Sequence, residues 1–179
     1  GFFSNYIFRG VSQTSEKPAV QGGFDYAHAS GFYAGAWGSN VSWLSDFTAY
    51  TGSSVELDVY GGYKGTIGKS DFGFDVGGIY YYYPGDRNTS LSADTTEVYG
   101  ALSWKWLTAK LSYVTGDYFG IADADGTMYF DVSASYPIGK SGVTLLAHVG
   151  SLKMSGTGND VLDYTDWKVG ATYALPKDF

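Results

Sequence analysis

Apolar residues occupy every second position in short stretches along most of this chain, and this period restricts the possible folds more than any other feature. In the stretch 55–64 valine, leucine, glycine and tyrosine hold the odd positions, while Glu56, Asp58 and Lys64 hold even ones. The stretch 72–82 repeats the arrangement. Successive side chains of a β-strand point to opposite faces, so each stretch would have one apolar and one polar face. The pattern therefore predicts strands, because a helix would scatter both sets.

Reading the whole chain with the same period predicts ten strands, over residues 3–9, 20–26, 32–38, 55–64, 72–82, 98–104, 107–113, 128–136, 143–149 and 167–175. The joins between them are alternately short and long. Short joins fall at Ser30-Gly31, 66–70, Lys105 and 138–141, and long polar joins at 11–18, 43–53, 84–95, 116–126 and 153–163. In outer-membrane barrels the short turns face the periplasm and the long loops face outside. We therefore predict an all-β fold, a transmembrane antiparallel up-and-down β-barrel of about ten strands, formed by residues 1–179 as one domain with both ends on the periplasmic side.

The composition fits this fold. Aromatic residues make up 18% of the chain, which contains 26 glycines and 4 prolines, and glycine averages only about 7% in soluble domains. Aromatic belts at membrane interfaces and glycine-rich curved strands would use such a composition. Cross-strand aromatic pairing in a soluble sheet is the open alternative. The residues expected in two interface girdles are Trp43, Tyr63, Trp104, Trp106, Tyr136, Trp167 and Tyr173.

Charge and hydropathy exclude several classes of protein. The formal net charge of −7 argues against a nucleic-acid partner, because binding phosphate requires a concentrated basic surface. Mean hydropathy is −0.13 and no run approaches the roughly 18 apolar residues of a transmembrane helix. Cysteine is absent, which suits a periplasm-folded protein without disulfides. The sequence from Gly1 does not open with a basic and then apolar leader, and we expect that a signal peptide has been removed rather than never present.

Four blocks of sequence resemble a known family. They are SNYIFRGVSQT at 4–14, PAVQGGFDY at 18–26, GFYAGAWGSN at 31–40 and VELDVYGGY at 55–63. These blocks are similar to the TorF-type porins of proteobacteria, and beyond Tyr63 the similarity is mainly one of strand rhythm. The resemblance implies an outer-membrane barrel with a pore function, and it brings no catalytic or metal-binding residues. At the C-terminus, Tyr173, Leu175 and Phe179 fit the signal read by the barrel-insertion machinery, although Lys177 interrupts the apolar series.

Charged residues between the apolar positions are predicted to point into the lumen. Exposing a charge to lipid at the bilayer midplane costs roughly 2–4 kcal/mol, so these side chains must face water or a partner. Carboxylates outnumber bases among them, which favours an aqueous path with a mild cation preference. The alternative is a salt-bridged plug, because a barrel of about eight strands has room only for its own side chains. The predicted lumen-lining residues are Arg9, Asp25, Glu56, Asp58, Asp75, Glu97, Tyr99, Lys110, Asp131, His148 and Lys168.

One inward pair can be placed from the turn that joins two strands. If Pro137 and Gly142 flank the turn at 138–141, antiparallel pairing puts Asp131 directly across from His148. Such a pair could relay protons or act in catalysis. An ion pair that braces the lumen is the favoured alternative, because no inward serine or cysteine nucleophile is evident beside the pair. The nearest hydroxyl is that of Ser133, and serine is common on inward strand faces.

The sequence therefore predicts an outer-membrane porin for passive diffusion of small polar solutes or ions. The rival hypothesis is a non-conducting barrel that anchors surface loops, such as 43–53 and 84–95, or assembles into a cell-surface array. Neither hypothesis involves enzymatic activity, a cofactor, a metal or nucleic acid. The expected partners are outer-membrane lipid and lipopolysaccharide, the insertion machinery during biogenesis, and further copies of the chain in a homo-oligomer.

Overall fold

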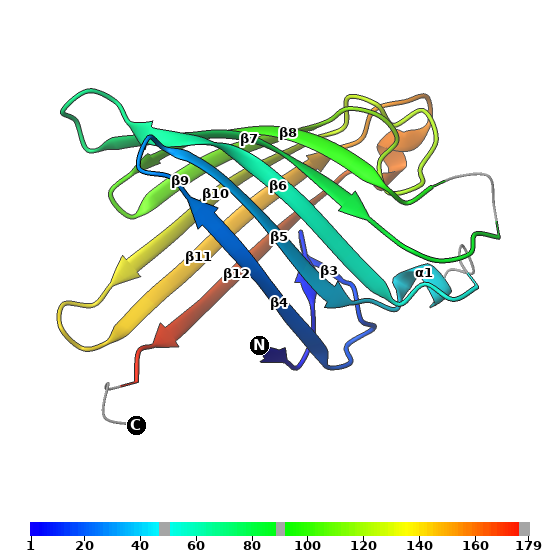
Figure 1. The fold of residues 1–179 in the computed structure, drawn as a ribbon, viewed down its shortest axis with the longest axis horizontal. Coiled ribbons are helices and arrows are strands. Elements are labelled where there is room, and N and C mark those ends of the chain that lie inside the picture. Colours follow the sequence, from blue (N-terminus) through cyan, green and yellow to red (C-terminus); the bar gives the residue numbers. More distant parts are fainter. Residues whose placement is uncertain (47–50, 89–91, 176–179) are drawn as a thin grey trace.

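The computed structural model describes residues 1–46, 51–88 and 92–175, and these form an all-β protein. Nine long strands run through it in chain order (Figure 1). They are β4 (Ala19–Ala27), β5 (Phe32–Asn40), β6 (Val55–Thr66), β7 (Phe72–Tyr82), β8 (Thr95–Trp104), β9 (Leu107–Val114), β10 (Met128–Pro137), β11 (Val143–Lys153) and β12 (Tyr164–Tyr173).

Each strand pairs antiparallel with its neighbours in sequence. With the short β1 (Phe2–Phe3), the order of the ten-stranded sheet is β1-β4-β5-β6-β7-β8-β9-β10-β11-β12. The predicted all-β class and the antiparallel sheet of ten strands are thus confirmed. The nine long strands coincide with the stretches of alternating polarity from residue 20 onwards, because alternation gives each strand two chemically different faces.

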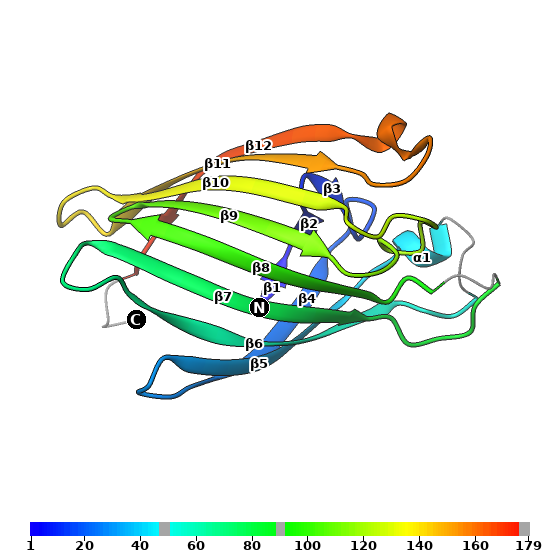
Figure 2. The same cartoon turned by 90° about the horizontal axis from the view of Figure 1, so that it is seen from above.

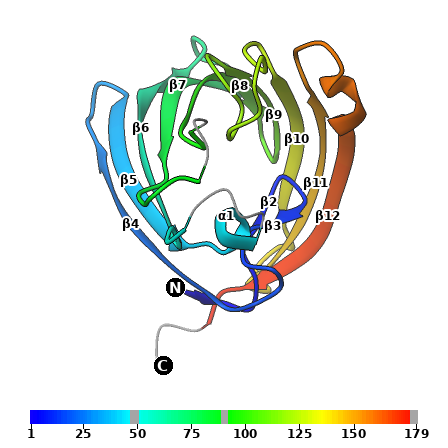
Figure 3. The same ribbon diagram turned by 90° about the vertical axis from the view of Figure 1, so that its right-hand side faces the viewer.

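The first predicted strand, 3–9, is wrong. Only Phe2 and Phe3 join the sheet, opposite Val20 and Ala19. The chain then turns inward and forms a separate hairpin of β2 (Ile7–Phe8) and β3 (Val11–Ser12). Arg9 and Gly10 between them have φ of 47° and 79°, as a tight type I′ turn requires. This hairpin lies inside the curve of the sheet (Figure 3).

The sheet is deeply curved but open. Seen along the strands it curls round an interior, with β4 and β12 facing each other across the gap (Figures 2 and 3). Within the described residues neither β1 nor β4 pairs with β12. The closure expected of a barrel is therefore not present, because β1 covers only the first residues of β4 and leaves the rest of that edge unpaired.

The connections separate into two ends. Tight turns join the long strands at one end, which we call the turn end, and the longer connections gather at the other, the loop end (Figure 1). The loop end carries a short helix, α1 (Trp43–Asp46), and a 3₁₀ turn, η1 (Asn159–Leu162). β12 runs to the turn end as predicted, whereas β1 lies beside the loop-side half of β4. The C-terminal signal residues Lys177 and Phe179 lie outside the described residues. No helix in the described residues is long and apolar enough to span a membrane.

The two faces of the sheet differ in chemistry. Large apolar side chains on the outer face are exposed to an unusual degree, 71% for Phe24, 60% for Val59 and 71% for Val169. The apolar residues that are buried gather instead at the loop end, in one cluster around Leu44 and Tyr83 and another around Val114 and Leu152. The apolar half of the strand pattern therefore faces outwards and does not form the core.

The register of β10 and β11 differs from the prediction by two residues. Ser133, not Asp131, lies opposite His148, and Asp131 lies opposite Gly150. The cause is the turn: the N–H of Ile138 donates to the carbonyl of Val143, so the connection runs from 138 to 143 and takes in Gly142.

The register can be tested by cross-linking, because the chain has no native cysteine. Ala134 and Ala147 face each other directly, whereas the pairing that the sequence predicted would put Val132 opposite Ala147. Oxidation should join Ala134→Cys with Ala147→Cys, since opposed Cβ atoms in a sheet lie about 4.5–5.5 Å apart. The pair Val132→Cys and Ala147→Cys should form a disulfide much more slowly. The rate is measured from the change in electrophoretic mobility of the cross-linked chain. The reverse order of rates would contradict the register.

Candidate functional site

The polar residues inside the sheet lie in three layers along its length. Glu56, Asp58 and Glu97 form the loop-side layer and are all buried. The middle layer contains half-buried side chains, and the turn-side layer is exposed. The predicted lumen residues of the middle layer are Asp75, Tyr99, Lys110, Asp131 and His148. Asp25, near the end of β4, is exposed, and so is Lys168, which lies opposite His148 on the edge strand β12. The interior is thus closed at the loop end and open toward the turn end.

The inward hairpin of β2 and β3, with the residues on either side of it (5–14), closes the loop end, and we call it the plug. Its Arg9 donates from both terminal nitrogens to the Glu97 carboxylate at 2.7 Å each. The two side chains are only 8% and 1% exposed. The guanidinium also lies 4.7 Å from the ring centre of Phe8 and 4.4 Å from that of Tyr129. Arg9 thereby joins the plug to β8 and β10.

Breaking a buried ion pair by removing one partner costs roughly 3–5 kcal/mol, because a desolvated charge remains. The Arg9 and Glu97 pair is therefore a strong reason for the plug to stay in place. The sequence analysis expected Arg9 to line the lumen from a strand. It lies inside as expected, but it is carried there by a hairpin turn.

Two further carboxylates face the plug from β6. Glu56 accepts hydrogen bonds from the hydroxyls of Tyr6 at 2.6 Å and Tyr83 at 2.5 Å. Oδ1 of Asp58 is buried without a hydrogen-bond partner among the described residues. Three carboxyl groups and one guanidinium thus lie buried close together at the base of the plug.

Aromatic rings surround the plug. Phe8 packs edge-on against Tyr81 and Phe119, with ring centres 5.7 and 5.9 Å apart. Trp43 of α1 packs against Tyr83 at 5.4 Å. Trp43 was expected in an outer girdle, and the structure corrects this: α1 turns its indole inward onto the buried cluster around Leu44.

The middle layer is organised around His148. Its Nε2 lies 2.8 Å from Asp166 Oδ1, and its Nδ1 contacts the Asp131 carboxylate. The Tyr129 hydroxyl donates to Asp166 at 2.8 Å. Both ring nitrogens therefore face carboxylates, so that His148 of β11 links Asp131 of β10 to Asp166 of β12.

This arrangement supports bracing better than catalysis. The Ser133 hydroxyl donates to Asp131 Oδ1 at 2.6 Å and makes no bond to the histidine. Activation of a serine requires a hydrogen bond between the serine and its base. In the described residues no group of three or more His, Cys, Asp or Glu side chains is arranged to hold a metal ion.

On the opposite wall, tyrosines hold the remaining inward charges. The Tyr33 hydroxyl donates to Asp75 at 2.6 Å and lies 2.5 Å from the Tyr99 hydroxyl. Lys110 Nζ sits 4.0 Å from the ring centre of Tyr99. Nearer the turn end two cavities, of about 400 and 190 Å³, lie along β6 to β9 and along β9 to β12. Their linings include Lys64, Asp75, Ser103, Thr108, Ser133 and Lys168.

The other girdle candidates lie on the outer surface. Tyr63 packs against Phe32, and Trp106 against Tyr136, with ring centres 4.9 and 5.6 Å apart. Trp167 is 74% exposed. Trp104 and Tyr173 are exposed as well.

Interior residues that the sequence analysis missed include Tyr6, Tyr83, Tyr129 and Asp166. Alternation could have identified Asp166, because it lies two positions before the inward Lys168 and next to the outward Trp167. Tyr129 could have been found in the same way from Asp131. Tyr6 belongs to the plug, which lacks the alternation of apolar and polar residues that indicates which way a strand side chain points.

The seating of the plug can be tested at Gly10. Its φ is +79°, and a Cβ there would lie 2.5 Å from Cβ of Asp166. Gly10→Ala should therefore loosen the plug by at least about 1 kcal/mol and make the bond after Arg9 several-fold more sensitive to trypsin. Gly158→Ala is the matched control, since its φ is +82° with no atom within 4 Å of the added Cβ. If trypsin cleaved after Arg9 at the same rate in both variants, this packing would be contradicted.

Comparison with known proteins gives one match. A family model described as bacterial protein of unknown function (Gcw_chp) matches residues 1–179. No curated protein and no solved structure matches the chain. The chain therefore belongs to the Gcw_chp family of bacterial proteins.

Proposed function

We propose that the chain is an outer-membrane porin whose lumen admits small cations and zwitterions and whose loop end is closed by the plug. The observation that carries this proposal is the distribution of polarity: large apolar side chains cover the outer face, and the charges lie inside. Soluble monomers rarely expose contiguous apolar patches beyond a few hundred Å². Barrel strands in lipid alternate in this sense, apolar outside and polar inside. The resemblance of residues 4–63 to TorF-type porins agrees with the proposal.

The proposal requires the edges of β4 and β12 to be paired. Unpaired backbone N–H and C=O groups in hydrocarbon cost several kcal/mol each, so an open edge is not tolerated there. The two edges face each other across the gap in Figure 3. Pairing of β4 with β12 would close one chain into a barrel, and pairing with a second copy would close a larger one.

The interior charge supports a preference for cations. Inward carboxylates outnumber inward lysines and arginines, as in cation-selective pores. The carboxylates are Asp25, Glu56, Asp58, Asp75, Glu97, Asp131 and Asp166, and the bases other than His148 are Arg9, Lys64, Lys110 and Lys168. Permeation requires displacement of the plug, because the loop-side layer leaves its carboxylates buried.

The sealed loop end also favours a second candidate function. A barrel that never opens would serve as an anchor for its loops or as the unit of a surface array. Both functions share the same outer face, and they differ only in whether ions pass once the plug is weakened.

Conductance of Arg9→Ala in planar bilayers separates the two functions. Loss of the guanidinium leaves Glu97 unpaired, at a cost of roughly 3–5 kcal/mol, so the plug should dissociate and channel openings should become several-fold more frequent. Arg87→Ala is the matched control, because Arg87 pairs with Asp94 at 3.3 Å near the surface and not with a buried carboxylate of the interior. The double variant Arg9→Ala with Glu97→Ala removes the stranded carboxylate and should conduct as well.

Currents through either variant should reverse at a potential that indicates cation preference. If the wild type, the single variant and the double variant are all electrically silent while inserted in the bilayer, the porin proposal fails. The anchoring function would then be the better account.

A further inference from the structure

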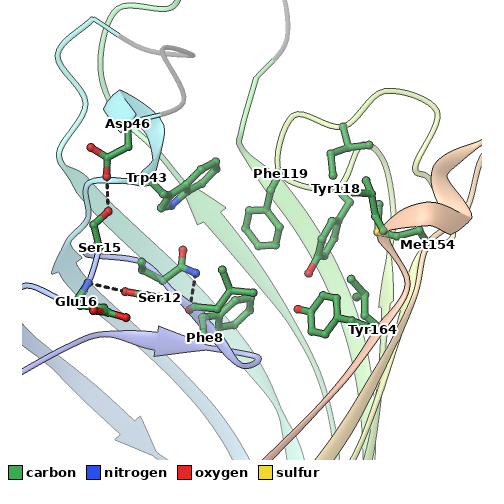
Figure 4. A pocket seen from close by; sticks show the side chains of 15 residues that line it. Phe8, Ser12, Ser15, Glu16, Trp43, Asp46, Tyr118, Phe119, Met154 and Tyr164 are labelled. Carbon is green, nitrogen blue, oxygen red and sulfur yellow. Dashed lines mark hydrogen bonds between the residues drawn. The ribbon is translucent and has the colours of Figure 1, made fainter.

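A further cavity lies at the loop end, apart from the two cavities nearer the turn end. It has a volume of about 700 Å³ and lies between the plug, α1, the connection after β9 and the start of β12 (Figure 4). Small-molecule sites typically enclose roughly 300–1,000 Å³ and are mostly apolar with a few placed polar groups. This cavity has both properties.

Five of the fifteen side chains that line it are aromatic. Phe8 of the plug faces Tyr118 and Phe119, which lie on the connection after β9, and Tyr164 of β12 lies beside them (Figure 4). The rings of Tyr118 and Phe119 pack edge-on with centres 4.7 Å apart. Faces of such rings attract cations within about 6 Å of the ring centre. Arg9 makes such a contact with the Phe8 ring, but its charge is already paired with that of Glu97.

The polar side of the cavity is acidic. Asp46 and Glu16 both line it, on the same side as Ser12 and Ser15 (Figure 4). Hydrogen bonds from Ser15 and Ser42 hold the pKa of Asp46 below its usual range, so the carboxylate is charged at neutral pH. The Glu16 backbone N–H donates to Ser12 Oγ at 3.0 Å, which fixes this part of the rim.

The nearby basic residues do not reverse this charge. Lys17 follows Glu16 and contributes one positive charge near Asp46. Lys153 on the opposite side is bound to Asp163 at 2.9 Å. No lysine or arginine lines the cavity in the described residues.

The whole loop end has the same sign. Its connections contain many more carboxylates than bases; they are residues 13–18, 41–54, 83–94, 115–127 and 154–163. The turns at the other end contain three bases, Lys69, Lys105 and Lys140, and one carboxylate, Asp71. A concentration of one sign around a low-dielectric cleft raises the local concentration of the opposite ion. The acidic residues of the loop end are Glu16, Asp46, Asp86, Asp94, Asp117, Asp123, Asp125, Asp160 and Asp163, and the bases are Lys17 and Arg87.

We infer that this cavity binds a small organic cation with an aromatic or alkyl body, the apolar part against the rings and the positive group toward Asp46 and Glu16. Anionic amphiphiles of the same size are disfavoured, because their head group would meet two carboxylates. This binding does not depend on the porin proposal, since it requires neither conduction nor movement of the plug.

Equilibrium binding to the full chain in nanodiscs of zwitterionic lipid tests the inference. The cationic probe is naphthylmethyl-trimethylammonium, and naphthalenesulfonate is the anionic control with the same ring system. Empty nanodiscs measure how much of each probe partitions into lipid. Titration calorimetry should show saturable binding of one cation per chain, at least tenfold tighter than the anion. Since the readout is affinity and not current, a silent pore would leave this result intact.

Two sets of variants assign the binding to this cavity. Leu162→Trp fills it from the exposed η1 and should abolish cation binding, and Ile121→Trp fills it from another connection if the first variant folds poorly. Glu16→Gln with Asp46→Asn should reduce the preference for the cation several-fold. Asp71→Asn, at the turn end, is the matched control and should leave both affinities unchanged.

The inference is overturned if the cation and the anion bind equally well. It is also overturned if cation binding survives both filling variants, or if the heat measured with the protein equals that of empty nanodiscs.

Discussion

A strand side chain can point in only two directions, and in this protein the apolar direction is outward. Every later feature follows from that constraint. The strands cannot pack their apolar faces together across the interior. In the part of the chain that the structure describes, the buried apolar clusters therefore lie at the loop end, where connections and the plug supply them. The outer face, with side chains such as Val59 and Phe24, is then left without a partner within the chain. A hydrocarbon surrounding is the medium that satisfies it best.

The same constraint puts charge inside, and the chain neutralises this charge differently along its length. At the loop end the Arg9 guanidinium and tyrosine hydroxyls hold buried carboxylates. In the middle His148 lies between two carboxylates. Toward the turn end lysines and carboxylates are exposed and need only water. An interior that is plugged at one end and exposed at the other suits the proposed path, which would open when the plug is displaced. The cavity at the loop end is lined in part by plug residues such as Phe8 and Val11.

Much of the fold was predictable from the sequence because its two signals are local. Alternation identified nine long strands, and the lengths of the joins assigned the turn and loop ends. The failures have a common cause, which is that local periods carry no information about closure or irregular segments. Residues 3–9 look like a strand, yet Tyr6 and Arg9 are drawn inward by partners on distant strands. The turn after Pro137 holds two more residues than its flanks suggested, which shifted Asp131 from its expected place opposite His148. Trp43 could not be placed because α1 is short and takes its direction from the cluster it packs against.

The claim on which this account depends is that lipid covers the outer face of the sheet. Single spin labels on the cysteine-free chain in bilayers test it directly, with Leu102→Cys on the outer face of β8 and Ser103→Cys beside the inner cavity. The account predicts that the label at 102 is relaxed strongly by oxygen, which concentrates in lipid, and weakly by a water-soluble nickel chelate. The label at 103 should show the opposite preference. Equal access of the nickel chelate to both positions would contradict the account.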